Sequence, residues 1–263
     1  MLTTTQVEEF YDRGWTVSDQ LLSPEECSLI RMTFDSLEPE KRSMEPGTMP
    51  LEIQYMRSYD VPMLRYYVSH PALVEIALQL IGPDVAVLWD QAVSRSPGLA
   101  GVLPWHQDAG YSHSDPPESM ITVWLAVTDA GSSNGGLKIS QNFPGAPVPH
   151  VEAPHGLRSV AEEYFPDEAD IITPQVKQGQ AIVFSPFLLH SSGGAMCHER
   201  RQSWVLTYSD ARARHGATGA PLTDRLTVAK DGEVTELTGS RERWQPSEAV
   251  TSGWVELDKT SPV

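Results

Sequence analysis

Apolar side chains recur at helical spacing through the first 84 residues of the chain. One such segment, Gln6–Arg13, ends before Gly14, a residue that readily adopts the left-handed conformation after a helix. A second segment begins at Pro24 within a Ser-Pro-Glu-Glu capping box, and a third, Pro71–Leu80, starts with proline and ends at Gly82. The pattern predicts amphipathic helices whose apolar faces need a larger surface to pack on.

From Val85 onward the pattern changes to short runs of β-branched and aromatic residues separated by turn signals. Asp231–Gly232 is a hairpin signal near the end of the chain. We expect a turn at Ser191–Gly194, and a long irregular excursion from the β-core at Pro144–Asp170, which lacks periodicity. The segments predicted to be strands are Val85–Val93, Met120–Val127, Gln180–Phe184, Ser203–Tyr208, Leu226–Ala229 and Val234–Leu237.

Helices followed by strands predict an α+β, mainly β, architecture, in which an antiparallel β-sandwich or barrel is supported by N-terminal helices. The length of 263 residues is sufficient for a sizeable core. We expect one domain over 1–263, with mainly helical support over 1–84, the β-core over 85–210, and a C-terminal extension with a hairpin over 211–263.

Acidic residues outnumber basic ones, since 35 Asp and Glu against 19 Lys and Arg give a formal charge of −16. This balance argues against nucleic acid or an anionic membrane as a partner, because both are bound through Lys and Arg. The longest apolar run, Ala181–Leu189, is far shorter than the roughly 20 residues of a membrane-spanning helix. Residues 1–6 carry no targeting signal, so we expect a cytoplasmic location. Cys27 and Cys197 form no CxxC motif, which predicts neither a disulfide framework nor a cysteine zinc site.

A histidine followed two residues later by a carboxylate is the first candidate for metal chemistry. Residues i and i+2 of an extended chain project to the same side, so such a pair can bind one metal ion. With a second histidine from another strand it forms the two-histidine, one-carboxylate triad that suits non-haem Fe(II). The spacing occurs three times, at His106/Asp108, His113/Asp115 and His150/Glu152. The third pair lies in the irregular excursion, where rigid facing ligands are less expected, and periodicity does not choose between the first two.

His190 is the candidate for the second histidine, because it closes a long apolar run. His198 lies in a polar stretch typical of a solvated histidine. Arg200 and Arg201 begin the next predicted strand, where a guanidinium could bind a carboxylate in a bidentate pair or lie on the surface. Alternate strand residues face opposite sides, so only one of the two arginines faces inward, and the pattern does not say which.

Five segments carry a further resemblance, in the order Trp105–Asp108, Ile121–Ala126, Asn134–Leu137, Gly179–Ser185, and His190 with Arg201 eleven residues on. In this order they resemble the phytanoyl-CoA dioxygenase (PhyH) family of Fe(II)- and 2-oxoglutarate-dependent oxygenases. The resemblance begins at the opening helix, runs to about Tyr208 and leaves the C-terminal extension uncovered.

The resemblance implies a double-stranded β-helix, or jelly roll, as the core, and assigns the catalytic metal ligands to His106, Asp108 and His190. The pair His113/Asp115 then becomes a local decoy or part of a substrate-side loop. Fe(II), the cosubstrate 2-oxoglutarate and O2 are the implied cofactors. The implied reaction is hydroxylation of an unactivated C–H bond, with 2-oxoglutarate decarboxylated to succinate. Relatives that halogenate lack the metal-binding carboxylate, so Asp108 favours hydroxylation.

The resemblance also implies a cosubstrate pocket. Arg201 is expected to bind the far carboxylate of 2-oxoglutarate, with Ser192 as its hydroxyl partner, and Trp124 is expected to line the pocket. Gln91, on the preceding predicted strand, is a further candidate for the same pocket, or simply a polar residue of a half-buried strand.

Substrate identity is less constrained by the sequence. The family's frequent Lys-x-Pro reads Arg95-Ser96-Pro97 here, and Ser140–Pro144 replaces its usual Pro-Gly-Ser-His, so the loops around the site differ. No basic cluster for phosphate or CoA is evident, and we expect a small metabolite, as in secondary metabolism. The same iron site would also serve epoxidation, desaturation or rearrangement. The alternative outside the enzymes is a non-catalytic jelly-roll binding protein. The sequence does not indicate an oligomeric state. The candidates for substrate contact, each with an ordinary structural explanation as well, are Tyr55, Arg57, Tyr111 and His113.

Overall fold

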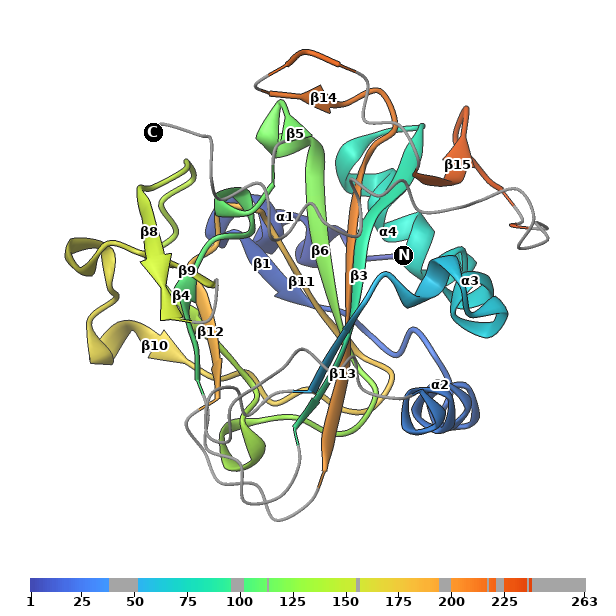
Figure 1. The fold of residues 1–263 in the computed structure, drawn as a ribbon, viewed down its shortest axis with the longest axis horizontal. Coiled ribbons are helices and arrows are strands. Elements are labelled where there is room, and N and C mark those ends of the chain that lie inside the picture. The colour runs from blue at the N-terminus through green and yellow to red at the C-terminus, as the bar shows by residue number, and fades with distance from the viewer. Residues whose placement is uncertain are drawn as a thin grey trace.

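Two antiparallel sheets pack face to face in the computed structural model, and helices cover the outer face of the larger sheet (Figure 1). This arrangement is a jelly roll with supporting helices, so the predicted fold class is confirmed. Within the part of the chain that is described, no helix is long and apolar enough to cross a membrane. The structure describes residues 1–37, 52–95, 102–112, 114–154, 157–193, 200–216, 218–220, 225–235 and 237.

Three of the four α-helices in these residues lie where the apolar spacing predicts them, and α3 is the addition. Capping boxes begin the first two helices, since the hydroxyl of Thr3 accepts from the Gln6 N–H and that of Ser23 from the Glu26 N–H. The first box places the start of α1 two residues before the predicted one. The helices are α1 Thr4–Arg13, α2 Pro24–Ser36, α3 Pro62–Val68 and α4 Pro71–Ile81.

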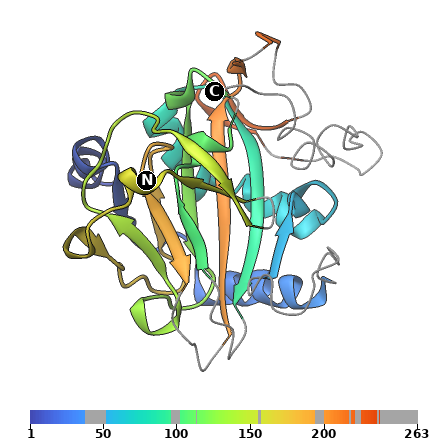
Figure 2. The ribbon, with the colours of Figure 1, turned by 60° about the vertical axis from the view of Figure 1, so that its left-hand side comes forward.

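The larger sheet has the strand order β1-β11-β6-β13-β3-β15-β16, and β2 pairs with β3 beside β15. Its two longest strands, β3 in teal and β13 in orange, run side by side and curl strongly (Figure 2). All six predicted strands overlap strands of this sheet, the last of them, Val234–Leu237, only at Val234. The division of the chain into one domain with an extension stays a prediction. The bounds are β1 Trp15–Val17, β2 Glu52–Tyr55, β3 Val85–Arg95, β6 Met120–Ala126, β11 Ala181–Phe184, β13 Arg201–Asp210, β15 Leu226–Lys230 and β16 Glu233–Val234.

The smaller sheet has the order β10-β7-β12-β4. Two expectations for this half of the chain were wrong. Residues 191–193, expected as a turn, belong to β12, whose small polar side chains carry no apolar period yet pair with strands on both sides. The excursion 144–170 contains the hairpin β8–β9, which forms a separate two-stranded sheet, because backbone pairing there does not require an alternating pattern. The remaining strands are β4 Val102–His106, β5 Ser114–Asp115, β7 Leu137–Ser140, β8 His150–Ala153, β9 Leu157–Val160, β10 Ile171–Ile172, β12 His190–Gly193 and β14 Arg214–His215.

The two faces of the larger sheet have different neighbours. Trp204 and Leu206 of β13 belong to the apolar core beneath the helices. Arg201, on the alternate face, lines the space between the two sheets. Arg200 lies at the surface, with its guanidinium 3.0 Å from the carboxylate of Asp35. The sequence did not show which of the two arginines faces inward, and in the structure it is Arg201.

Candidate active site

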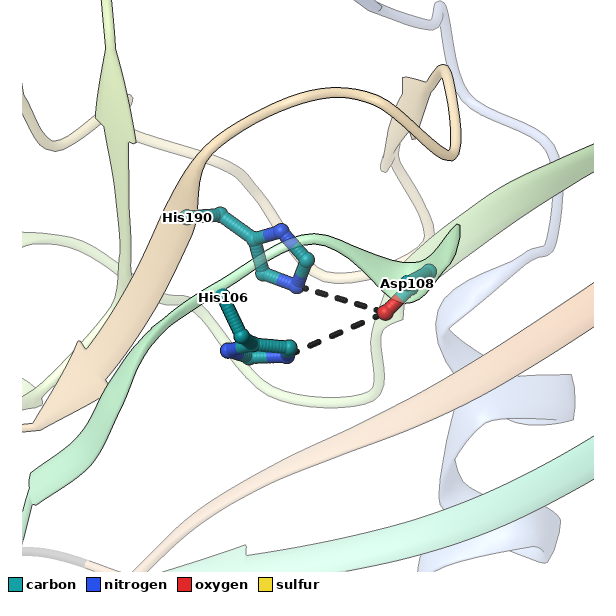
Figure 3. A group of neighbouring side chains, drawn as sticks. All are labelled: His106, Asp108 and His190. Carbon is teal, nitrogen blue, oxygen red and sulfur yellow. Dashed lines mark ion pairs between the residues drawn. The ribbon is translucent and has the colours of Figure 1, made fainter. Parts of the chain in front are cut away.

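Three side chains that can ligate a metal ion lie close together where β4 ends and β12 begins. His106 ends β4 and pairs in register with His190, which begins β12. Asp108 follows His106 in the 3-10 turn Asp108–Gly110. One ligand atom of each residue lies within 4.8 Å of the other two, and all three side chains point toward one another (Figure 3).

Both imidazoles are oriented for metal binding by the carbonyl group two residues earlier. Nδ1 of His106 donates to the carbonyl oxygen of Pro104 at 2.8 Å, and Nδ1 of His190 donates to that of Leu188 at 3.0 Å. Each Nε2 is then left with its lone pair, and these atoms lie 3.8 Å and 3.6 Å from Oδ1 of Asp108. Burial, with a smaller contribution from His190, lowers the pKa of His106 well below its usual value, so this ring is neutral, as a ligand must be.

The second oxygen of Asp108 is held by a residue that the sequence analysis missed. Oδ2 accepts a hydrogen bond from the hydroxyl of Thr122 on β6, which lies 3.2 Å from the hydroxyl of Thr207 on β13. Both threonines are fully buried. In the sequence, each threonine is a polar residue within an apolar strand. The high β-propensity of threonine explains such a position equally well, so the sequence does not reveal the contact with Asp108.

This donor set fits an Fe(II) ion. Two neutral nitrogens and one carboxylate oxygen form the facial triad of non-haem iron enzymes, which leaves further coordination positions for other ligands. The three residues are buried, with His106, Asp108 and His190 only 5%, 8% and 4% exposed. Two imidazoles and a carboxylate buried this closely are difficult to explain without a bound cation.

A cavity continues from the triad between the two sheets. Its volume is about 920 Å³ when the open solvent at its entrance is included. Most of its wall is aliphatic or aromatic. Tyr55, Gln91, Trp124, Ser192 and Arg201, five of the residues predicted for cosubstrate or substrate contact, are in the wall. The full lining is Ile53, Tyr55, Trp89, Gln91, Val93, Leu103, His106, Asp108, Tyr111, Trp124, Leu137, Leu157, Phe184, His190, Ser192, Arg201 and Val205.

Arg201 places a cation in this mostly aliphatic and aromatic wall while being only 1% exposed. Its guanidinium donates to the hydroxyl of Ser203 at 2.8 Å and to the carbonyl oxygen of Gly135 at 2.7 Å. The guanidinium carbon lies 5.4 Å from the ring centre of Trp124, a cation–π distance. These contacts fix the orientation of the guanidinium in the wall.

Strand pairing aligns several of the predicted residues in one row. Tyr55 lies opposite Gln91, Gln91 opposite Val205, and Val205 opposite Trp124. Because directly opposed residues share a face, this row crosses the inner face of four neighbouring strands. Gln91 therefore lies in the cavity wall between a tyrosine and an aliphatic side chain.

One of the candidates for substrate contact lies elsewhere. Arg57 is not in the cavity wall, and its guanidinium lies 3.5 Å from the carboxylate of Asp60. His113 lies outside the described residues. Tyr111 is in the wall, but its hydroxyl donates to the carbonyl oxygen of Arg158 at 2.9 Å and accepts from the N–H of the same residue at 2.7 Å. Burial raises the pKa of Tyr111, so its phenol stays protonated.

Comparison with known proteins places the chain in a family. The family model described as phytanoyl-CoA dioxygenase (PhyH) matches residues 10–203, which include the whole triad and Arg201. The chain belongs to the phytanoyl-CoA dioxygenase family. The prediction from sequence is confirmed, and with it the enzyme class of Fe(II)- and 2-oxoglutarate-dependent dioxygenases.

Individual relatives of this oxygenase act on small molecules. The L-proline trans-4-hydroxylase of Streptomyces griseoviridis is 25% identical over 222 residues, which cover 74% of this chain and 82% of the relative. The ectoine dioxygenase of Nocardia farcinica (strain IFM 10152) is 26% identical, over 78% of this chain and 76% of the relative. The solved structure of the epimerase SnoN with Fe3+, alpha ketoglutarate and nogalamycin RO has a similar fold, with a TM-score of 0.68 at 19% identity, covering 90% of this chain and 96% of that one.

Proposed function

We propose that this oxygenase hydroxylates an unactivated C–H bond of an uncharged small metabolite, with 2-oxoglutarate converted to succinate. The observation that carries the proposal is the buried triad of two imidazoles and a complete carboxylate beside a buried, inward arginine. His106, Asp108 and His190 hold Fe(II), which together with 2-oxoglutarate and O2 supplies the oxidising power for the hydroxylation.

The residues around the metal have separate tasks. Arg201 binds the far carboxylate of the cosubstrate, and Ser192, Trp124 and Gln91 shape the pocket around it. The charges support this assignment, because the ion offsets Asp108 and one cosubstrate carboxylate, while Arg201 offsets the other. The aliphatic and aromatic wall excludes bulk water from the reacting groups.

Tyr55 and Tyr111 belong to the substrate side of the cavity in this proposal. Among the described residues of the wall, the charged side chains are Asp108 and Arg201, which the metal and the cosubstrate already occupy. A charged substrate would be desolvated there without a counter-ion, at a cost of several kcal/mol per ion. This absence favours an uncharged substrate. The acidic composition supports an enzyme without nucleic-acid or anionic-membrane partners, and a cytoplasmic location stays a prediction.

An anaerobic titration tests the proposal directly. Wild-type protein with Fe(II) and 2-oxoglutarate is expected to give a weak visible charge-transfer band, which His106→Ala abolishes. His70→Ala is the matched control, because His70 lies 3.5 Å from Glu26 outside the cavity. In air, pools of uncharged metabolites are then screened for substrate-dependent succinate release. A wild-type protein without the band would overturn the oxygenase assignment and support the non-catalytic binding protein.

A further inference from the structure

The hairpin β8–β9 is bonded along its length to the segment that carries the first two metal ligands. The hydroxyl of Ser159 donates to the carbonyl oxygen of Trp105 at 3.2 Å, and the guanidinium of Arg158 donates to that of Gly110 at 2.8 Å. The bonds between Tyr111 and the backbone of Arg158 close the far end. Leu157, on the same hairpin, is part of the cavity wall. The hairpin is therefore a wall of the active site as well as a support for the metal turn.

Gln107, the residue between the two ligands, is the centre of this attachment. Its side chain is fully buried and is hydrogen-bonded to backbone groups. Its amide nitrogen donates to the carbonyl oxygens of Ala146 at 3.0 Å and Phe187 at 2.6 Å. Its amide oxygen accepts from the N–H of Val148 at 2.8 Å. The side chain thus joins the metal segment to the start of the hairpin and to the connection that leads into His190.

His150 holds the backbone at the same point. Its Nδ1 donates to the carbonyl oxygen of Val148 at 2.8 Å, which leaves Nε2 to accept the backbone N–H of Gln107 at 3.0 Å. The ring also lies against Gly110, where a Cβ atom would collide with its Cδ2 and Nε2 atoms. The imidazole therefore fills the inside of the turn that presents Asp108.

We propose that His150, together with Gln107, is a positioning residue that sets the orientation of Asp108 toward the metal and couples it to the hairpin wall. This inference rests on the proposed function, since it requires Asp108 to be a metal ligand. His150 was expected to be an incidental member of the three His-x-Asp/Glu pairs. It acts here through the backbone of the functional pair, 43 residues away in the sequence.

The test is an anaerobic Fe(II) titration at saturating 2-oxoglutarate, read by the charge-transfer band. His150→Leu keeps the volume but removes the acceptor, whereas His150→Gln keeps an acceptor at the place of Nε2. Loss of a residue that orients a metal ligand weakens metal binding roughly 10- to 100-fold. We expect a loss in this range for His150→Leu, most of it restored in His150→Gln. Val151→Ser is the matched control, because Val151 is the next residue of the hairpin and is 49% exposed.

A second variant reaches the same contact from the other side. Gly110→Ala displaces the imidazole without changing it, so it is expected to weaken Fe(II) binding like His150→Leu, and the double variant is expected to be no weaker than either single one. The unfolding midpoint of each apo-protein is measured in parallel and should stay near that of the wild type. Wild-type affinity in His150→Leu, or equal losses in the Leu and Gln variants, would overturn the positioning role. Failure of the wild type itself to form the band would instead contradict the proposed function.

Discussion

Replacing Thr122 by valine removes the hydroxyl group that donates to Oδ2 of Asp108, with little change in the shape of a fully buried side chain. A hydrogen bond to a charged group contributes about 1.5–3 kcal/mol net. If the metal-bound carboxylate uses the whole of this energy, Fe(II) binding weakens by about one to two orders of magnitude, at roughly 1.4 kcal/mol per decade. The same range is typical when the partner of a metal ligand is removed.

The assay compares three variants by anaerobic Fe(II) titration in the presence of 2-oxoglutarate. Thr207→Val is the matched control, because Thr207 lies opposite Thr122 and 3.2 Å from its hydroxyl but is not bonded to Asp108. Thr122→Ser keeps the donor and should bind Fe(II) within a few-fold of the wild type. The reasoning is refuted if Thr122→Val binds Fe(II) as tightly as the wild type, or if Thr207→Val loses as much affinity as Thr122→Val.

Three further predictions concern the cosubstrate, the substrate and the stability of the core. Arg201→Lys should raise KM for 2-oxoglutarate at least about tenfold, because a lysine lacks the planar fork that binds a carboxylate with two donors, whereas Arg200→Lys at the surface should not. L-Proline and ectoine, both zwitterions, should not stimulate succinate release, and stimulation by either would contradict the uncharged substrate. Burial raises the pKa of Asp90 from 3.8 to about 6, although hydrogen bonds from Ser58 and Trp204 act in the opposite direction. The contribution of Asp90 to the free energy of unfolding is therefore complete below the unperturbed pKa of 3.8 and is lost as the pH rises through about 6. The difference in unfolding free energy between wild type and Asp90→Asn should therefore fall by about 1.4 kcal/mol from about pH 5 to about pH 7.5, measured by urea denaturation, and a constant difference would contradict this cause.

Elements with a strong period were predictable from the sequence, and elements formed mainly by backbone pairing were not. The helix at Pro24 has a capping box and an apolar stripe, the helix at Pro71 begins with proline and has an apolar stripe, and the strands of the larger sheet have buried runs. The strand that begins at His190 consists of small polar residues, and its place is set by pairing with β7 and β4. Sequence patterns do not record such pairing, so this strand was read as a turn.

The site shows the same division. Spacing left His106 and His113 as alternatives, and it was the resemblance to a family that favoured His106. Thr122 and His150 were missed for a physical reason. Each acts through one hydrogen bond to a different segment of the chain, and a single sequence does not show which separate segments come into contact.

The inward face of β13 explains why the metal and cosubstrate ends of the site keep a fixed spacing. Arg201 and Thr207 lie on this face six residues apart, or about 20 Å of extended strand. The arginine side chain extends along the strand to Ser203 and toward Trp124, in the direction of the threonine pair beside Asp108. Because β13 is paired with β3 on one side and β6 on the other, neither end can shift without moving the whole ladder. The spacing between the threonine pair and the arginine is therefore a property of the sheet, whereas the hairpin β8–β9 both forms part of the cavity wall and supports the turn that presents Asp108.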